Sequence, residues 1–201
     1  MYFPQLTRRK NYKTKADGSF YSTYSEYGGE IAEDCQERCV YCDVLLNEIG
    51  GEGMHIDHFK PQKHFPELES VPFNLVLACA KCNRLKSDWW PEKDGTSSSG
   101  KNGFVDPFSN PMNSYYKVEA NGSITALKDP SLYMINLMAL NRPIRCRIRQ
   151  ARRLRAEAHK MIDVVSSEMM ALTSRPRKEI EEKLPRLSAA LTKAKQMLQA
   201  L

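Results

Sequence analysis

Two Cys-x-x-Cys pairs constrain this chain more than any other feature of its sequence. The four residues are Cys39, Cys42, Cys79 and Cys82. Four thiolates bind Zn²⁺ tetrahedrally and leave no open position, which is typical of a structural zinc. The segment between the pairs is rich in loops, so zinc would hold together a region that core burial alone would not stabilise. The other reading is four reduced cysteines without metal, and Cys35 is a possible substitute ligand.

The composition is that of an ordinary folded protein. Of the 201 residues, 41% are hydrophobic and 27% are charged, which does not indicate disorder. No stretch approaches the roughly 18 uninterrupted apolar residues of a membrane span, so no membrane association is expected. The N-terminus has no apolar signal segment, which predicts a cytoplasmic location. In that compartment six cysteines favour metal binding over a disulfide framework, and Cys146 has no assigned role.

The positive charge is concentrated in two blocks. The net charge is +6 at pH 7, and the isoelectric point is near 9.0. The blocks comprise Arg8, Arg9, Lys10, Lys13 and Lys15, and then Arg142, Arg145, Arg147, Arg149, Arg152, Arg153 and Arg155. Such blocks attract a phosphate backbone without reading its sequence, although a merely basic protein would carry them too. We expect Arg149, Arg152 and Arg153 to face solvent and to bind the substrate.

Residues suited to hydrolytic chemistry lie between and after the cysteine pairs. In chain order they are His55-Ile56-Asp57-His58, Phe73-Asn74-Leu75 and, directly after the last cysteine, Asn83-Arg84-Leu85-Lys86. This order, from Cys39 to Lys86, resembles the HNH (ββα-metal) endonuclease superfamily, and in particular its zinc-bound branch. The many matched positions make the resemblance specific, whereas an isolated Asp-His dipeptide would carry no weight.

The resemblance implies a role for each matched residue. His58 corresponds to the general base, and Asp57 to a ligand of the catalytic ion. Asn74 corresponds to the residue that braces the loop and orients the histidine, and Asn83 to a second metal ligand. A histidine, with an ordinary pKa near 6.5, can accept a proton at neutral pH. Because Asp57 and Asn83 both offer hard oxygen donors, they favour Mg²⁺ or Mn²⁺ in addition to the structural zinc.

Strand geometry leaves alternatives open at this site. Neighbouring side chains of a regular strand point to opposite faces, so Asp57 and His58 can serve one site only if the strand twists or ends there. His55, on the Asp57 face, is the rival base; it could also be a ligand, a phosphate contact or an ordinary edge residue. Lys86, on the helix that follows the last cysteine, is either a phosphate contact or a solvated lysine.

The sequence divides into four predicted segments. They are a basic N-terminal arm with a lead-in helix (1–34), the nuclease module (35–92), a flexible linker with a β-hairpin (93–128) and a basic helical region (129–201). Within the module the predicted elements are a helix (30–38) leading into it, strands (54–59 and 73–77) and a helix (83–88). The hairpin turn is indicated by Asn121-Gly122 between two apolar runs.

The C-terminal region is predicted to be helical. Asp129 has the properties of an N-cap, with Pro130 at the first helical position. Apolar residues then recur at steps of three and four over residues 143–172, which predicts one long helix. A second apolar stripe predicts another helix, which Pro185 should kink or restart. Two such helices form an antiparallel hairpin or a partner-binding surface.

These features predict an α+β fold, in which a small zinc-stapled ββα-metal (HNH) module carries a short β-hairpin and a C-terminal helical hairpin. The predicted function is a metal-dependent endonuclease that hydrolyses DNA. The alternative is a catalytically inactive, zinc-stabilised module that binds nucleic acid or protein. The region between Phe104 and Arg142 is similar to the HNH effectors of Septu and retron-type anti-phage systems, which act beside an ATPase. That resemblance implies a defence role and an ATPase partner from the same operon.

Overall fold

The computed structural model describes residues 2–92 and 95–199. They form two compact units, Met1–Cys146 and Arg147–Leu201. All described strands lie in the first unit. Residues 93 and 94, with which the predicted linker begins, lie outside the described residues, as do residues 1, 200 and 201 of the predicted terminal segments. The division into four segments stays a prediction.

A short helical region leads into the first cysteine pair. A 3₁₀ turn, Tyr24–Tyr27, runs directly into helix α1, Gly28–Asp34. The helix ends earlier than the predicted residue 38 because Gln36 and Glu37 have positive φ angles of 53° and 51°. A right-handed helix cannot continue through two left-handed residues. The chain therefore turns here and enters the cysteine pair as a loop.

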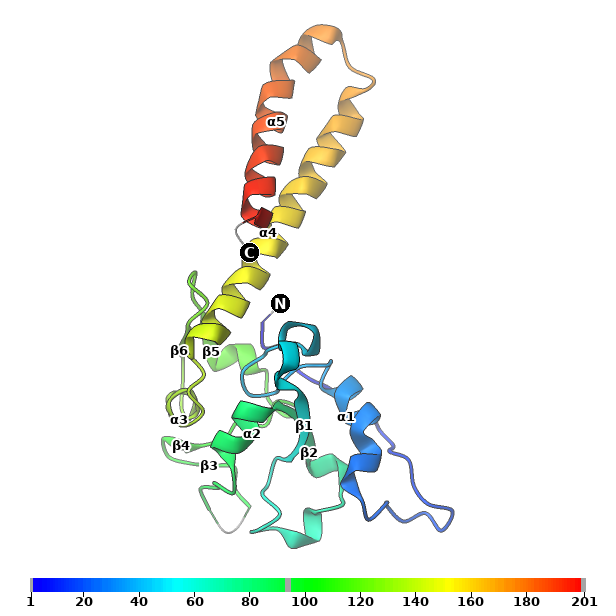
Figure 1. Cartoon of the computed structure of the whole chain (residues 1–201), viewed down its shortest axis with the longest axis vertical. Helices are drawn as coiled ribbons and strands as arrows, with labels where there is room; N and C mark the ends of the chain where they lie inside the picture. The colour runs from blue at the N-terminus through cyan, green and yellow to red at the C-terminus, as the bar shows by residue number, and fades with distance from the viewer. Residues whose placement is uncertain (1, 93–94, 200–201) are drawn as a thin grey trace. The chain divides into compact units, whose positions relative to one another are not determined.

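The central element is an antiparallel pair of strands followed by a helix. Strand β1 spans Met54–His58 and strand β2 spans Leu75–Cys79, with His58 opposite Leu75. Helix α2, Ala80–Lys86, follows β2 directly and packs on both strands (Figure 1). Helix α1 also packs against β2, which is buried along its whole length. This is the ββα arrangement that the sequence predicts.

The boundaries of the module differ from the predicted ones by a few residues. Strand β2 starts after a 3₁₀ turn at Pro72–Asn74, where the prediction placed the strand's first residues. Helix α2 starts at Ala80 rather than at residue 83, with Cys79 as its N-cap residue. The second cysteine pair is therefore the N-terminal turn of α2, and Cys82 is held by the helix itself.

Short elements complete the first unit. They are β3 (Ser98–Ser99), β4 (Asn102–Gly103), β5 (Tyr116–Val118), β6 (Ile124–Ala126) and α3 (Ser131–Leu137), with 3₁₀ turns at Leu46–Glu48, Gly50–Glu52, Pro66–Leu68 and Met112–Ser114. Strands β3 and β4 pair antiparallel, so the described part of the predicted flexible linker contains a small hairpin.

The predicted hairpin around Asn121-Gly122 is confirmed by the pairing of β5 with β6. Glu119 N donates to Ser123 O at 2.8 Å across the turn, and Gly122 has a φ of 79°, which favours glycine. The predicted start of the next helix is wrong by one residue. Pro130, rather than Asp129, is the N-cap residue of α3.

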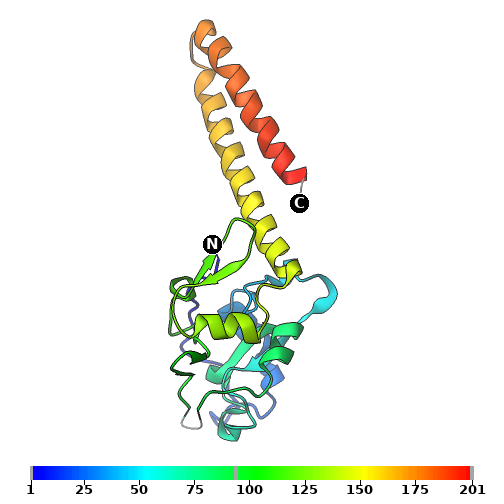
Figure 2. The ribbon, with the colours of Figure 1, turned by 90° about the vertical axis from the view of Figure 1, so that its left-hand side faces the viewer.

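The second unit is an antiparallel helical hairpin (Figures 1 and 2). Helix α4 spans Pro143–Leu172, as predicted, and α5 spans Arg177–Gln199. Val165, Leu172 and Leu187 form the buried cluster between them. The predicted stripe of apolar residues is therefore core at these positions. Within the described residues, no helix is both long and apolar enough to cross a membrane.

The prediction that Pro185 restarts the second helix is wrong, and the alternative, a kink at Pro185, stays a prediction. Helix α5 runs through Pro185 without a break. Proline removes one N–H donor and so frees the carbonyl of Glu181, one turn earlier. Both residues are exposed, so water can satisfy that carbonyl, which makes an internal proline tolerable here. The mixed α+β fold itself is confirmed.

Candidate functional site

The four predicted cysteines come together in one buried cluster. Their sulfur atoms all lie within 4.8 Å of one another, and the Sγ atoms of Cys42 and Cys79 are 3.8 Å apart. Four Zn–S bonds of about 2.3 Å in a tetrahedron place the sulfurs about 3.8 Å apart, so the cluster fits zinc. None of the four forms a disulfide. These cysteines can therefore hold a structural zinc ion.

The backbone around the first pair is shaped for this purpose. Cys39 N donates to Val44 O, and Asp43 N donates back to Cys39 O, both at 2.9 Å. Asp43 sits in the left-handed region at φ 64°, which closes the turn. Its carboxylate accepts from Arg38 Nη1 at 2.7 Å and from Phe3 N at 3.0 Å. This network holds the thiols of the pair on one side of the turn.

The other two cysteines lie outside the cluster. Cys35, the possible substitute ligand, is buried and accepts a hydrogen bond from Leu77 N at 3.2 Å. Burial raises the pKa of its thiol to about 12, so it stays protonated. Cys146 is half-buried, and its thiol donates to Asn141 O at 3.5 Å.

Asp57 and His58 open onto one pocket of about 230 Å³. Its other lining residues are Pro61, Gln62, Lys63, Ser87 and Asp88. Strand β1 ends at His58, so the alternation of side chains does not separate the two residues. Both are nearly buried, with 6% of Asp57 and 9% of His58 exposed. The structure therefore brings this predicted pair together at the end of a strand.

One oxygen of the Asp57 carboxylate is committed to protein partners. Tyr41 donates its hydroxyl proton to Asp57 Oδ2 at 2.7 Å, and Lys86 Nζ lies 3.6 Å from the same oxygen. Oδ1 has no hydrogen-bond partner among the described residues. Burial raises the pKa of Asp57, while Lys86 and Tyr41 oppose the rise. Asp57 therefore presents one carboxylate oxygen that is available to a cation.

His58 is fixed in a single tautomer by its hydrogen bond. Its Nε2 lies 2.8 Å from Glu69 O. A carbonyl oxygen can only accept, so Nε2 carries the proton and Nδ1 keeps its lone pair. The ring of Tyr24 packs edge-on against the imidazole, with centroids 4.9 Å apart. The orientation of the imidazole is therefore set from two sides.

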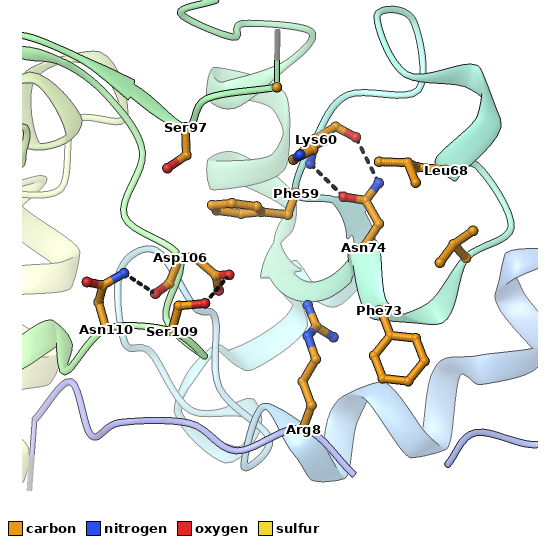
Figure 3. A pocket seen from close by; sticks show the side chains of 12 residues that line it. Arg8, Phe59, Lys60, Leu68, Phe73, Asn74, Ser97, Asp106, Ser109 and Asn110 are labelled. Carbon is orange, nitrogen blue, oxygen red and sulfur yellow. Dashed lines mark hydrogen bonds between the residues drawn. The ribbon is translucent and has the colours of Figure 1, made fainter. Parts of the chain in front are cut away.

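Asn74 fixes the chain directly after the histidine. Its side chain accepts from Lys60 N and donates to Lys60 O, both at 2.9 Å (Figure 3). Its own carbonyl accepts from Phe59 N at 2.8 Å. Phe59 in turn packs edge-on against the buried Trp90, with centroids 5.4 Å apart. Asn74 and this packing together hold the end of β1 in place.

Lys86 differs from the expectations, whereas the role of Asn83 stays a prediction. Lys86 is completely buried, and its Nζ donates to His58 O at 2.7 Å, so the expected phosphate contact has no surface here. Lys86 is buried because its position on α2 faces β1 rather than solvent. Asn83 is half-buried one turn before Ser87 and is not among the residues that line the pocket. His55 is exposed on β1, away from the pocket lining.

Two residues near the pocket were missed in the sequence. Tyr41 lies between the cysteines of the first pair, and only its contact with Asp57 reveals its place. Asp88 lines the pocket, forms an ion pair with Lys63 and accepts from His64 Nε2 at 2.9 Å through its carbonyl. In the sequence, Asp88 could have been recognised only from its position at the end of the predicted helix.

The basic blocks are less exposed than expected. Arg149 is 1% exposed, so the prediction that it faces solvent is wrong; Arg145, one turn earlier on α4, is buried as well. Arg152 and Arg153 are half-buried, and Arg153 pairs with Glu157 at 2.7 Å. The arginines follow each other around the helix, so some necessarily fall on its buried side.

The first basic block is also partly bound within the protein. Arg8 Nη1 donates to Leu75 O at 2.9 Å. Figure 3 shows Arg8 together with Asn74 and Lys60 around a second pocket, of about 350 Å³, whose lining includes neither Asp57 nor His58. Arg9 pairs with Glu33 at 2.8 Å and with Asp34 at 2.9 Å. Both arginines stabilise the first unit, and Arg8 also lines the second pocket.

A buried cluster of four cysteines beside an Asp-His strand end, in a ββα frame, defines a ββα module that could hold a metal ion. Residues 39–88 match the family model described as HNH endonuclease, and this segment is an HNH endonuclease domain. The resemblance seen in the sequence is thereby confirmed.

Two curated relatives match parts of the chain. Protein ea31 of Escherichia phage lambda is 40% identical over 57 residues, which are 28% of this chain and 18% of that protein. Septu protein PtuB of Bacillus thuringiensis is 31% identical over 77 residues, 38% of this chain and 26% of that protein. The matches thus span about a quarter or less of either relative's length. No solved structure matches the chain significantly.

Proposed function

We propose that this protein is a metal-dependent endonuclease that hydrolyses DNA phosphodiester bonds, with His58 as general base. The observation that carries the proposal is the hydrogen bond between His58 Nε2 and Glu69 O. With Nε2 bonded to Glu69 O at 2.8 Å, Nδ1 is the atom left to take a proton from an attacking water. His58 lines the same pocket as Asp57, so that water and a bound cation would share one space.

The pocket fits a divalent cation that keeps most of its waters. Mg²⁺ is commonly bound through one or two carboxylates, and Asp57 Oδ1 has no partner among the described residues. Asp57 would hold a single Mg²⁺ or Mn²⁺ ion. The family resemblance gives Asn83 as the second protein ligand, although Asn83 lies outside the lining of this pocket, one turn before Ser87 on α2. When bound, the ion supplies positive charge to the scissile phosphate and to the leaving oxygen. Asn74 keeps His58 in position through Lys60.

The test is cleavage of supercoiled plasmid by the purified chain. Cleavage is expected with Mg²⁺ or Mn²⁺ and none with EDTA. His58→Ala should abolish cleavage, while His159→Ala, at an exposed histidine of α4, should cleave normally. Normal cleavage by His58→Ala together with inactive His55→Ala would make His55 the base. Binding of plasmid without cleavage under any metal would support the alternative, an inactive zinc-stabilised binding module.

We further propose that the nuclease is an effector of anti-phage defence that works with an ATPase partner. The 31% identity to Septu protein PtuB over 77 residues supports a defence role. The plasmid assay should therefore be repeated with the product of the neighbouring gene. A change in cleavage rate is expected if that protein restrains or activates the nuclease. An unchanged rate and no co-purification would contradict the partnership while leaving the nuclease proposal intact.

A further inference from the structure

Two arginines of the second basic block point at the cysteine cluster. Arg142 Nη2 lies 3.6 Å from Cys82 Sγ and 3.9 Å from Cys79 Sγ. Arg145 Nη2 donates to Cys79 Sγ at 3.4 Å, and the Arg145 side chain is only 3% exposed. Both arginines belong to the first unit, which ends at Cys146. Both guanidinium groups therefore have protein atoms as partners.

The charge of the cluster explains why cations are needed there. Four thiolates and one Zn²⁺ ion carry a net charge of minus two. All four cysteines are completely buried, and a buried charge is strongly unfavourable unless an opposite charge lies close by. The two guanidinium groups bring two positive charges to this site. An arginine stays charged even when buried, which a lysine or histidine does less reliably.

We propose that Arg142 and Arg145 are the counter-cations of a zinc tetrathiolate and determine how firmly the module retains its metal. N–H donors on the sulfurs draw electron density from the thiolates and stabilise them in their charged form. The two arginines therefore belong to the metal site, although the sequence groups them with the nucleic-acid-binding charge.

Other contacts hold each arginine in place. Arg142 Nη1 donates to Met138 O at 2.7 Å and to Ala139 O at 3.2 Å, the carbonyls just after α3. Arg145 pairs with Glu52, whose carboxylate also accepts from Lys81 N at 3.2 Å in the first turn of α2. The guanidinium groups are thus fixed before metal binds, which is what an outer-shell partner requires.

The experiment measures zinc retention by the purified full chain. The rate of zinc transfer to the chelator pyridylazoresorcinol is recorded for wild type, Arg142→Gln, Arg145→Gln and Arg147→Gln. We expect each of the first two to release zinc about tenfold faster or more. Arg147→Gln is the matched control, because Arg147 is an exposed arginine of the same helix, two positions after Arg145. Its release rate should equal that of wild type.

Lysine variants separate charge from folding. Arg142→Lys and Arg145→Lys keep the positive charge, so their zinc retention should return most of the way to wild type. Cysteine alkylation by N-ethylmaleimide should follow the same order as zinc release, and thermal unfolding of each variant identifies any general loss of fold. Wild-type release rates in both glutamine variants would overturn the proposal. So would lysine variants that fold normally yet lose zinc as fast as the glutamine variants. Wild type without zinc would remove its premise, independently of any nuclease activity.

Discussion

At the scale of single residues, neighbouring groups determine which atom of the Asp57 carboxylate and which atom of the His58 imidazole can take part in chemistry. Tyr41 and Lys86 both approach Asp57 Oδ2, and Glu69 O accepts a hydrogen bond from His58 Nε2. Among the described residues, Asp57 Oδ1 and His58 Nδ1 are thereby left without a hydrogen-bond partner. Substitutions of Asp57 or His58 should therefore change the cleavage rate and its metal dependence differently from substitutions of the residues that only position them.

The metal dependence of cleavage should separate these roles. His58→Ala should lower the cleavage rate by about 10²- to 10⁴-fold at every metal concentration, because it removes only the proton acceptor. Asp57→Ala should lose activity through weak metal binding, and Asn83→Ala should recover part of its activity at high Mn²⁺. Asn74→Ala should slow cleavage without changing the metal requirement. Rates measured against Mg²⁺ and Mn²⁺ concentration test the set, and recovery of His58→Ala at high metal would contradict it.

Lys86 should matter for stability as well as for the site. It is completely buried, lies 3.6 Å from Asp57 and donates to His58 O. Lys86→Met keeps most of the volume but leaves the buried Asp57 carboxylate without its charged partner, which typically costs about 3–5 kcal/mol of unfolding free energy. Urea unfolding measures the loss. Arg84→Met, at an exposed site of the same helix, is the control. Equal stability of the two variants would show that the buried pair contributes nothing.

At the scale of elements, helix ends and interruptions depend on what surrounds them. Helix α1 ends early at two left-handed residues, whereas α5 continues through Pro185. The difference lies in the backbone conformation, because Gln36 and Glu37 are exposed as Pro185 is. An exposed proline leaves its orphan carbonyl to water, but a left-handed backbone redirects the chain itself.

Pro185 should nevertheless weaken α5. Proline in a helix interior is up to about 3 kcal/mol less favourable than alanine, and Pro185 is exposed, so its replacement disturbs no packing. Pro185→Ala should raise the unfolding free energy of the helical hairpin by about 1–3 kcal/mol. Thermal unfolding followed by circular dichroism checks this. Lys195→Ala, at another exposed site of α5, should change stability by less than about 0.5 kcal/mol. A destabilised Pro185→Ala variant would contradict the explanation.

At the scale of the whole molecule, the net charge of +6 is not all available to a partner. Arg8 and Arg9 are bound inside the first unit, Arg142 and Arg145 face the thiolates, and Arg149 is buried. Charge counted along the sequence therefore overstates the charge that a nucleic acid would meet.

Within the second basic block, Arg147 and Arg155 are exposed. We expect these two to supply sequence-independent affinity for DNA. Replacing both with glutamine should weaken binding similarly for all sequences and reduce the salt slope of log affinity by about 2. Fluorescence anisotropy at several salt concentrations measures this. Arg177→Gln, at an exposed site in α5, is the control. If the double variant keeps the wild-type slope, the phosphate contacts lie elsewhere.

The sequence by itself determined the features whose causes are local. Cysteine spacing predicts the zinc-binding pairs, Asn121-Gly122 predicts the hairpin, and apolar periodicity predicts α4 from residue 143 to residue 172. The order of Asp57, His58, Asn74 and Asn83 indicates the HNH domain, which the family match confirms. Each of these patterns depends on residues that belong to one turn, one helix or one motif.

Only the tertiary structure decided which partner each polar group has. Tyr41 donates to Asp57, and the buried Lys86 donates to His58 O. Arg142 and Arg145 contact cysteines that lie 60 and 66 positions earlier in the sequence. A charged side chain carries the same local signal whether it meets solvent, a phosphate or a thiolate. Its environment is set by the segments that fold around it, and no pattern along the chain records that. For this reason the sequence predicted which residues form the site, whereas the charged and hydrogen-bonding partners of these residues are visible only in the tertiary structure.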